Sequence, residues 1–340
     1  MPALHPDAQA LLRAMREAGR PPFEALLPAE AREAYGASRA ALQPPLDAVA
    51  LARDLAAPGP GGPVRLRLYR GLGTGPEPLP GLLYLHGGGW MLGDLASHDW
   101  VCRRLATVAR ACVVAVDYRL APEHPFPAAL EDAAAALAFV AAEAGALGID
   151  PSRLAVGGDS AGGNLAAVLA LMGRDGHLPA TAFQALLYPA VDLGMTGESY
   201  ARVTRDVPIT AATMRYFIDH YAPDPGMRSD WRASPARAPS LAGLPPALVL
   251  TCGHDPLCDE GRAYAARLER EGVPVTALHL GDQIHGMLTM GRAIGAAAPT
   301  LAFVGQALRE AWRTASGAPV SVDSPTPLPE DQGQTTNSRQ

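Results

Sequence analysis

Lysine is entirely absent from this sequence. The chain has 340 residues, and its 28 basic residues are all arginine. A Schiff-base enzyme needs a lysine amine, and a Walker A phosphate loop or an S-x-x-K acyl-enzyme also places a lysine at the site. Every mechanism of these three kinds is therefore excluded.

Cysteine, strong charge of one sign and long apolar runs are also scarce. The formal net charge is −6 without long single-sign runs, which argues against nucleic acid as a partner. The four cysteines have no C-x-x-C spacing, so we expect reduced thiols and a cytoplasmic location. We expect no signal peptide and no membrane span. No metal or cofactor is expected, and the sequence leaves open whether the chain forms a homodimer.

Short apolar runs alternate with helical stretches along most of the chain. Continuous apolar strands between helices indicate a mostly parallel sheet with helices on both faces, which is an α/β fold. One expected helix is the alanine-rich segment 127–145. The expected strands are a pair around the turn PGPGG (58–62), followed by 82–86, 112–118, 154–158, 183–189, 247–252 and 275–280.

Three segments differ from this alternating pattern. Residues 1–45 predict two short amphipathic helices, and residues 190–240 form a long excursion between two strands, typical of a lid or an inserted subdomain. The polar, proline-rich tail 316–340 is expected to be disordered. The α/β core then consists of two parts, 46–189 and 241–315.

The segment GDSAG places Ser160 between an apolar strand and a helix. This G-x-S-x-G pattern in a strand–turn–helix context is typical of a nucleophile held on a tight turn, where neighbouring residues must lack bulk. The turn directs the serine hydroxyl to the carboxyl end of the sheet, where α/β proteins bind their ligands. Ser160 is therefore the candidate nucleophile.

A serine hydroxyl needs a base and an orienting carboxylate. His285, directly after the last expected strand, is the candidate base. Asp255 follows the strand 247–252 at the same edge of the sheet as Ser160, and Asp282 is a competitor closer to His285 in sequence. The order serine, aspartate, histidine is that of the α/β-hydrolases.

A glycine run, HGGGW, follows the strand 82–86. Consecutive glycines allow backbone N–H groups to turn toward a developing oxyanion, a contribution of roughly 3–4 kcal/mol for one donor. Such a run can instead bind phosphate, but that use normally opens a helix and often includes a lysine. We therefore interpret the run as an oxyanion hole.

Together these segments resemble the hormone-sensitive-lipase-like esterases, the bacterial family IV group of the α/β-hydrolases. The resemblance covers roughly residues 50–312, and its motifs are HGGGW, DYRLAPEHPFPAALED, GGDSAGGNLA, LLYPAVD and DPLCDEG, followed by the histidine of IHGM. It implies an α/β-hydrolase fold, with an eight-stranded, mostly parallel sheet and flanking helices. It also implies a helical cap built from residues 1–45 and 190–240.

The resemblance implies a role for each site residue. Ser160 is the nucleophile, His285 the base and Asp255 the acid, and the N–H groups of Gly88, Gly89 and Ala161 form the oxyanion hole. Trp90 and Met287 depart from the family's commoner residues and leave the detailed specificity open. The candidate substrate contacts are Trp90, Tyr188, Met214, Phe217 and Met287.

The predicted function is a serine carboxylesterase that hydrolyses short- to medium-chain acyl esters through an acyl-enzyme. An amidase, a lactonase or a deacetylase with the same triad is the alternative within the enzyme class. Outside that class, the plant gibberellin receptors resemble this family but lack the catalytic histidine. The presence of His285 disfavours such a ligand-binding receptor.

Overall fold

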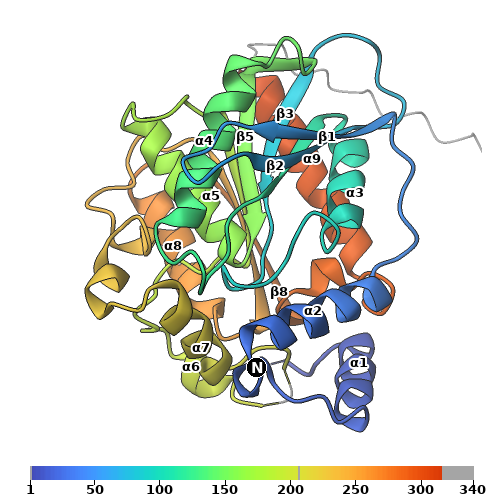
Figure 1. Ribbon diagram of the computed structural model, residues 1–340, viewed down its shortest axis with the longest axis vertical. Helices are drawn as coiled ribbons and strands as arrows, with labels where there is room; N and C mark the ends of the chain where they lie inside the picture. Colours follow the sequence, from blue (N-terminus) through green and yellow to red (C-terminus); the bar gives the residue numbers. More distant parts are fainter. Residues whose placement is uncertain (1, 206, 316–340) are drawn as a thin grey trace, which may run out of the picture.

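The computed structural model in Figure 1 describes residues 2–205 and 207–315. Its centre is an eight-stranded sheet with the strand order β1-β2-β4-β3-β5-β6-β7-β8. The strands are β1 Leu51–Ala57, β2 Val64–Arg70, β3 Leu79–Leu85, β4 Cys112–Asp117, β5 Ile149–Asp159, β6 Phe183–Leu187, β7 Ala247–His254 and β8 Val275–Ile284.

The sheet is mostly parallel. The hairpin of β1 and β2 is antiparallel, with Leu51 opposite Arg70, and β2 is antiparallel to β4. All pairings from β4 through β3, β5, β6 and β7 to β8 are parallel. The predicted α/β fold with an eight-stranded, mostly parallel sheet is confirmed.

Helices cover both faces of the sheet because its central strands are apolar on both sides. In β4, Val114 and Val116 belong to one buried cluster, whereas Val113 and Ala115 belong to the other. Helices α4, α5 and α8 cover the first face, and α3 and α9 cover the second (Figure 1). Their bounds are α3 Asp99–Ala109, α4 Ala128–Ala142, α5 Ala161–Arg174, α8 Cys258–Arg270 and α9 Ala297–Ala315.

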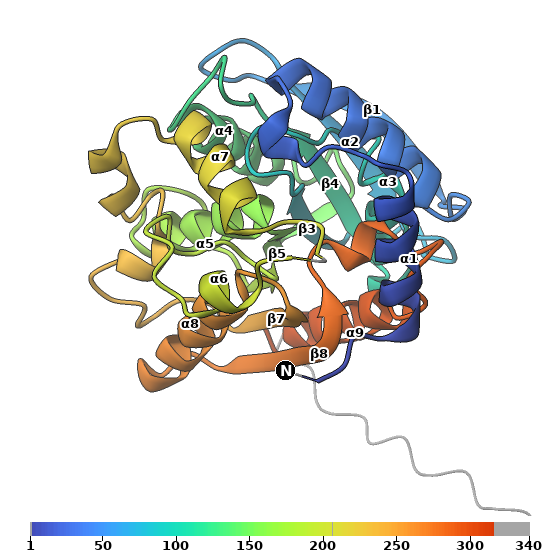
Figure 2. The same cartoon turned by 90° about the horizontal axis from the view of Figure 1, so that it is seen from below.

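A second group of helices gathers at one end of the sheet (Figures 1 and 2). Three of them precede the sheet in sequence, and the others lie between β6 and β7. They are α1 Pro6–Glu17, α2 Pro28–Leu42, α6 Ser199–Arg202 and α7 Ala211–Tyr221, with the short 3₁₀ helices η1 Phe23–Ala25, η2 Pro225–Ser229 and η3 Pro235–Arg237. A further 3₁₀ helix, η4 Met287–Thr289, follows β8. The tail predicted for 316–340 lies outside the described residues.

Within the described ranges, no helix combines the length and the hydropathy that a membrane crossing requires. The four cysteines are buried and none forms a disulfide. Burial raises the pKa of the Cys102 and Cys252 thiols well above their usual range, so both stay protonated.

Candidate active site

Ser160 lies on a sharp turn between the end of β5 and the start of α5. Its φ of 57° and ψ of −117° form a strained backbone conformation for a residue with a side chain. The Ser160 N–H donates to the carbonyl of Leu187 over 2.9 Å, which ties the turn to β6. A Cβ atom on Gly162 would collide with the carbonyl oxygen of Leu85, so this position requires glycine. The sequence motif therefore reflects a real close approach of backbone.

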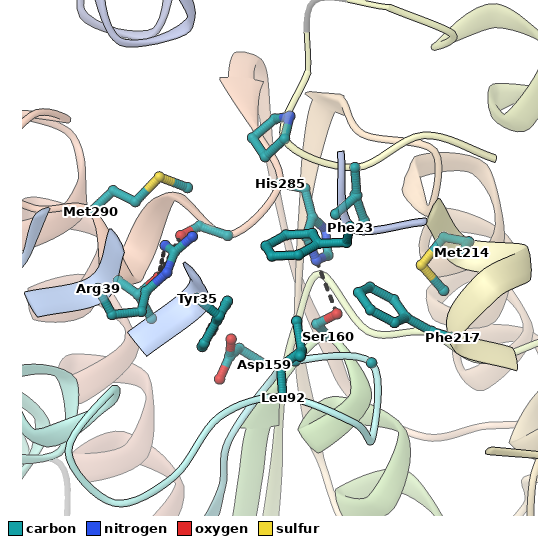
Figure 3. Close-up of a pocket in the computed structure, with 16 residues that line it drawn as sticks. Phe23, Tyr35, Arg39, Leu92, Asp159, Ser160, Met214, Phe217, His285 and Met290 are labelled. Atoms are coloured by element: carbon teal, nitrogen blue, oxygen red, sulfur yellow. Dashed lines mark hydrogen bonds between the residues drawn. The ribbon is translucent and has the colours of Figure 1, made fainter. Parts of the chain in front are cut away.

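The side chains of Ser160, His285 and Asp255 form one hydrogen-bonded chain. Oγ of Ser160 lies 2.9 Å from Nε2 of His285, and Nδ1 of the same imidazole lies 2.7 Å from Oδ2 of Asp255 (Figure 3 draws the first bond). The other carboxylate oxygen of Asp255 accepts the N–H of Leu257 over 2.8 Å. Asp255 has no exposed surface, and Ser160 and His285 are 7% and 6% exposed.

Both ring nitrogens of His285 are thus engaged, and Asp282 is the partner of neither. Asp282 lies within β8, where its backbone carbonyl accepts the N–H of His5 over 2.9 Å. Between the two carboxylates that the sequence leaves open, the geometry therefore favours Asp255.

The glycine run after β3 lies beside Ser160. Gly88 and Gly89 both line the same cavity as Ser160, and their φ values are 129° and 61°. Among the described residues, no acceptor takes the N–H of either glycine. Ala161 begins α5, and the first N–H groups of a helix have no acceptor within the helix. Three backbone donors are therefore available around the hydroxyl.

Asp159 holds this glycine run in position. Its buried carboxylate accepts the N–H of Gly87 over 3.0 Å and the hydroxyl of Tyr84 over 2.8 Å, and His98 Nε2 lies 3.2 Å away. Burial alone raises the pKa of Asp159, but the charge and hydrogen bond of His98 and the bond from Tyr84 lower it further, so the net shift is downward. Asp159 is therefore ionised, and its carboxylate oxygens are occupied by hydrogen bonds that hold the loop.

His86, the first residue of the run, is a structural member of the loop. Its Nδ1 lies 2.9 Å from the Gly87 carbonyl, and its ring stacks on Tyr118 at 4.2 Å. Burial, together with His98, lowers the pKa of His86 to about 4, which keeps its imidazole neutral at neutral pH.

A cavity opens above Ser160, with an empty volume of about 520 Å³ that includes open solvent at its mouth. Its wall combines residues of the sheet edge with residues of the helices at that end (Figure 3). The lining residues are Phe23, Tyr35, Arg39, Gly88, Gly89, Leu92, Asp159, Ser160, Pro208, Ile209, Met214, Phe217, His285, Gly286, Thr289 and Met290.

The predicted substrate contacts divide into two groups. Met214 and Phe217 of α7 line the cavity, whereas Trp90, Tyr188 and Met287 do not. Trp90 is fully buried and stacks on Tyr221 at 4.4 Å, and Met287 is also fully buried. The ring of Tyr188 packs against the imidazole of His285 at 4.9 Å, so it supports the base and does not face the cavity.

Several residues that line the cavity belong to none of the sequence motifs. Phe23, Tyr35 and Arg39 come from η1 and α2, and Thr289 and Met290 come from the turn after β8. The amphipathic pattern of residues 1–45 predicts helices but not which side chains reach the cavity. In the described part of the chain, no cluster of three or more His, Cys, Asp or Glu side chains is suited to hold a metal ion.

Comparison with known proteins agrees with this geometry. A family model described as the alpha/beta hydrolase fold matches residues 82–289, which include every member of the hydrogen-bonded chain. The chain belongs to the α/β-hydrolase family. Among curated members, it is 39% identical to an ethyl acetate hydrolase of Pseudomonas putida over 316 residues, covering 91% of this chain and 99% of the relative. It is 43% identical to the carboxylic ester hydrolase LipN of Mycobacterium tuberculosis over 250 residues.

The LipN match covers 70% of this chain and 64% of LipN. Solved structures of the family are also similar. An ester hydrolase from the metagenome of Lake Arreo, in complex with a bipyridine phosphonate derivative, matches with a TM-score of 0.88 and 39% identity over 90% of this chain and 98% of its own. An esterase of Pyrobaculum calidifontis matches with a TM-score of 0.83 and 39% identity, again over 90% and 98%. The predicted class, a carboxylic ester hydrolase of the α/β-hydrolase family, is confirmed.

Proposed function

We propose that the protein is a serine carboxylesterase that cleaves short- to medium-chain acyl esters through an acyl-enzyme intermediate. The hydrogen-bonded chain from Ser160 through His285 to Asp255 is the observation that carries this proposal. A hydroxyl, an imidazole and a buried carboxylate in this order convert a weak nucleophile into an effective one.

Acylation begins when Oγ of Ser160 attacks the ester carbonyl carbon and its proton passes to Nε2 of His285. Nδ1–H of His285 donates to Asp255, which fixes the tautomer that leaves Nε2 free to accept and stabilises the imidazolium that forms. The carbonyl oxygen becomes an oxyanion. When the tetrahedral intermediate collapses, the alcohol leaves with the proton from Nε2, and the acyl group stays on Oγ.

Deacylation repeats these steps with water. Nε2 takes a proton from the water as its oxygen attacks the acyl carbon, and the collapse of the second intermediate returns that proton to Oγ and releases the acid. In both halves the oxyanion is held by the N–H groups of Gly88, Gly89 and Ala161. These donors are fixed before the reaction, so they stabilise the charge without reorganisation.

We also propose that residues 1–45 and 190–240 act as a cap over the cavity. Phe23 comes from the first segment and Met214 and Phe217 from the second, and all three line the cavity with Ser160. Apolar side chains at this position favour an acyl chain, and a cavity enclosed by two segments limits its length. The name of the relative from Pseudomonas putida, ethyl acetate hydrolase, supports a preference for short esters.

Replacement of Ser160 by alanine tests the nucleophile. We expect Ser160→Ala to lose hydrolysis of p-nitrophenyl butyrate by a factor of at least about 1,000, since removal of a triad member leaves only binding and the oxyanion hole. A fluorophosphonate label should attach to the wild-type protein and not to the variant. Ser152→Ala is the matched control, because Ser152 is an exposed serine on the same strand, β5.

Retained turnover in folded Ser160→Ala would reject the assignment. A series of aryl esters of increasing acyl length, extended to amides and lactones, then separates the esterase from an amidase or a lactonase. A wild-type protein that resists the fluorophosphonate would instead favour the receptor.

A further inference from the structure

The cavity contains a buried positive charge that has no acidic partner among the described residues. Arg39, in the last turn of α2, is 7% exposed, and its guanidinium lines the cavity that holds Ser160. Arginine is rarely buried to this extent unless an acidic group pairs with it, because the desolvation of an unpaired charge is costly.

Within residues 2–205 and 207–315, the partners of Arg39 are two neutral groups. Its Nη1 donates to Oγ1 of Thr289 over 2.6 Å, and its guanidinium lies 4.7 Å from the centre of the Tyr35 ring. Nε is buried and has no acceptor among the described residues. Burial raises the pKa of Tyr35 to about 12, so its hydroxyl supplies no negative charge near neutral pH.

Among the described residues, no carboxylate oxygen lies within 4.0 Å of the Arg39 guanidinium, so no acidic side chain neutralises its charge. Asp159 carries the one carboxylate among the described residues that line the cavity, and its oxygens are engaged by Gly87, Tyr84 and His98. The last carbonyls of α2 stabilise a cation through the helix dipole, but they are no counter-ion. The guanidinium has five N–H donors, and the Thr289 hydroxyl is the one hydrogen-bond acceptor that it has among the described residues.

The position of Arg39 within the cavity indicates what these donors face. Figure 3 shows Arg39, Tyr35 and Met290 on one side of Ser160, and Met214 and Phe217 on the other. The cavity thus has a polar, positively charged side and an apolar side, with the hydroxyl between them. An ester that reacts at Ser160 extends its two branches in two directions, so one branch can lie against each side.

We propose that Arg39, held in place by Thr289, forms a subsite for a carboxylate carried by the substrate, so that the enzyme selects esters with an anionic group on one branch. This proposal depends on the esterase function proposed above. A planar guanidinium matches the two oxygens of a carboxylate better than any other side chain does. The cost of desolvating the buried charge is then offset when the carboxylate of the substrate binds.

The test compares esters that differ in one group. Monoethyl glutarate and ethyl valerate share an acyl chain, but the first ends in a carboxylate and the second in a methyl group. O-acetyl glycolate and ethyl acetate form the corresponding pair for the alcohol branch. The measured quantity is the ratio of kcat/KM for the charged ester to kcat/KM for the neutral ester, determined by pH-stat titration.

We expect the ratio for one of the two pairs to fall by about 10- to 100-fold in Arg39→Met, which is the range for a hydrogen bond to a charged group. Arg39→Lys keeps the charge but loses the planar fork, so its ratio should lie between those of the wild type and Arg39→Met. The matched control is Arg32→Met. Arg32 lies on the same helix outside the cavity and is paired with Glu123.

The design separates the two levels of the proposal. If the wild-type protein cleaves no ester of either kind, the esterase function fails. If it cleaves the neutral esters, but both ratios stay within about threefold of wild type in the two folded Arg39 variants, Arg39 only braces the turn at Thr289 and the subsite is wrong. Equal losses on charged and neutral esters would overturn it in the same way.

Discussion

Asp255 and His285 are hydrogen-bonded over 2.7 Å although 30 residues separate them in sequence. Each follows a different parallel strand, Asp255 after β7 and His285 after β8, and these two strands are neighbours in the sheet. Parallel pairing brings their carboxyl ends to one edge, where β5 delivers Ser160 as well. The site thus results from sheet topology, and the loops need only be short.

Replacement of the two competing aspartates tests this relationship. Asp255→Asn should lower kcat on p-nitrophenyl butyrate by at least about 100-fold, because an amide neither fixes the productive tautomer nor stabilises the imidazolium. Asp282→Asn should stay within about threefold of wild type, since its side chain has no bond to His285. If the Asp282 variant is the more damaged of the two, the proposed triad is wrong.

Much of this site could be predicted from the sequence because its parts are local. The turn around Ser160 requires small neighbours in a strand–turn–helix context, and that pattern is visible in a short segment. The choice between Asp255 and Asp282 depends on which carboxylate reaches Nδ1 of His285. That distance is set by tertiary packing, so the sequence favours Asp255 only through its place after a strand at the same sheet edge as Ser160 and through the family resemblance.

The cavity wall is the part that sequence reasoning could not supply. Phe23 and Arg39 belong to N-terminal helices whose apolar pattern predicts amphipathicity but not their orientation over the sheet. Trp90 and Met287 flank motif residues, yet both are fully buried beneath the loops and do not line the cavity. Proximity in sequence to a functional residue does not determine the direction of a side chain.

The conformation of the oxyanion loop leads to a second prediction. Gly89 has a φ of 61°, and a Cβ atom there would collide with the ring of Phe217. Gly89→Ala should therefore displace the N–H groups of the loop and reduce kcat by about 100-fold, comparable to the loss of one oxyanion donor. The measurement is steady-state hydrolysis of p-nitrophenyl butyrate, together with a thermal melt.

Gly73→Ala provides the matched control. Gly73 has a similar φ of 72°, but a Cβ atom added there would meet no other atom within 4 Å, and this glycine does not line the cavity. Both variants incur the left-handed backbone cost, of roughly 1–2 kcal/mol. If Gly89→Ala and Gly73→Ala reduce kcat by the same factor, backbone strain alone explains the loss, and the position of the oxyanion loop does not contribute to it.

Glu260 gives a prediction about stability and pH. This residue of α8 is buried, and its carboxyl oxygens accept the N–H of Val191 over 2.7 Å and the hydroxyl of Tyr200 over 2.8 Å. Glu260 therefore connects two elements to helix α8 of the core: the segment that follows β6, through Val191, and helix α6, through Tyr200. Burial raises the pKa of Glu260 to about 8, and the hydrogen bonds from Val191 and Tyr200 only partly oppose that rise.

Because this folded-state pKa lies above the usual value of 4.5, the native state binds the proton more tightly than the unfolded chain does. The associated stability is complete below about pH 4 and is lost as the pH rises to about 8, a total of roughly 5 kcal/mol. Glu260→Gln cannot titrate, so its free energy of unfolding in urea should fall less than that of wild type between pH 5 and pH 8. Glu269→Gln, an exposed change on the same helix, should follow wild type. Parallel pH profiles for wild type and Glu260→Gln would show that Glu260 is already ionised in the folded protein at pH 5.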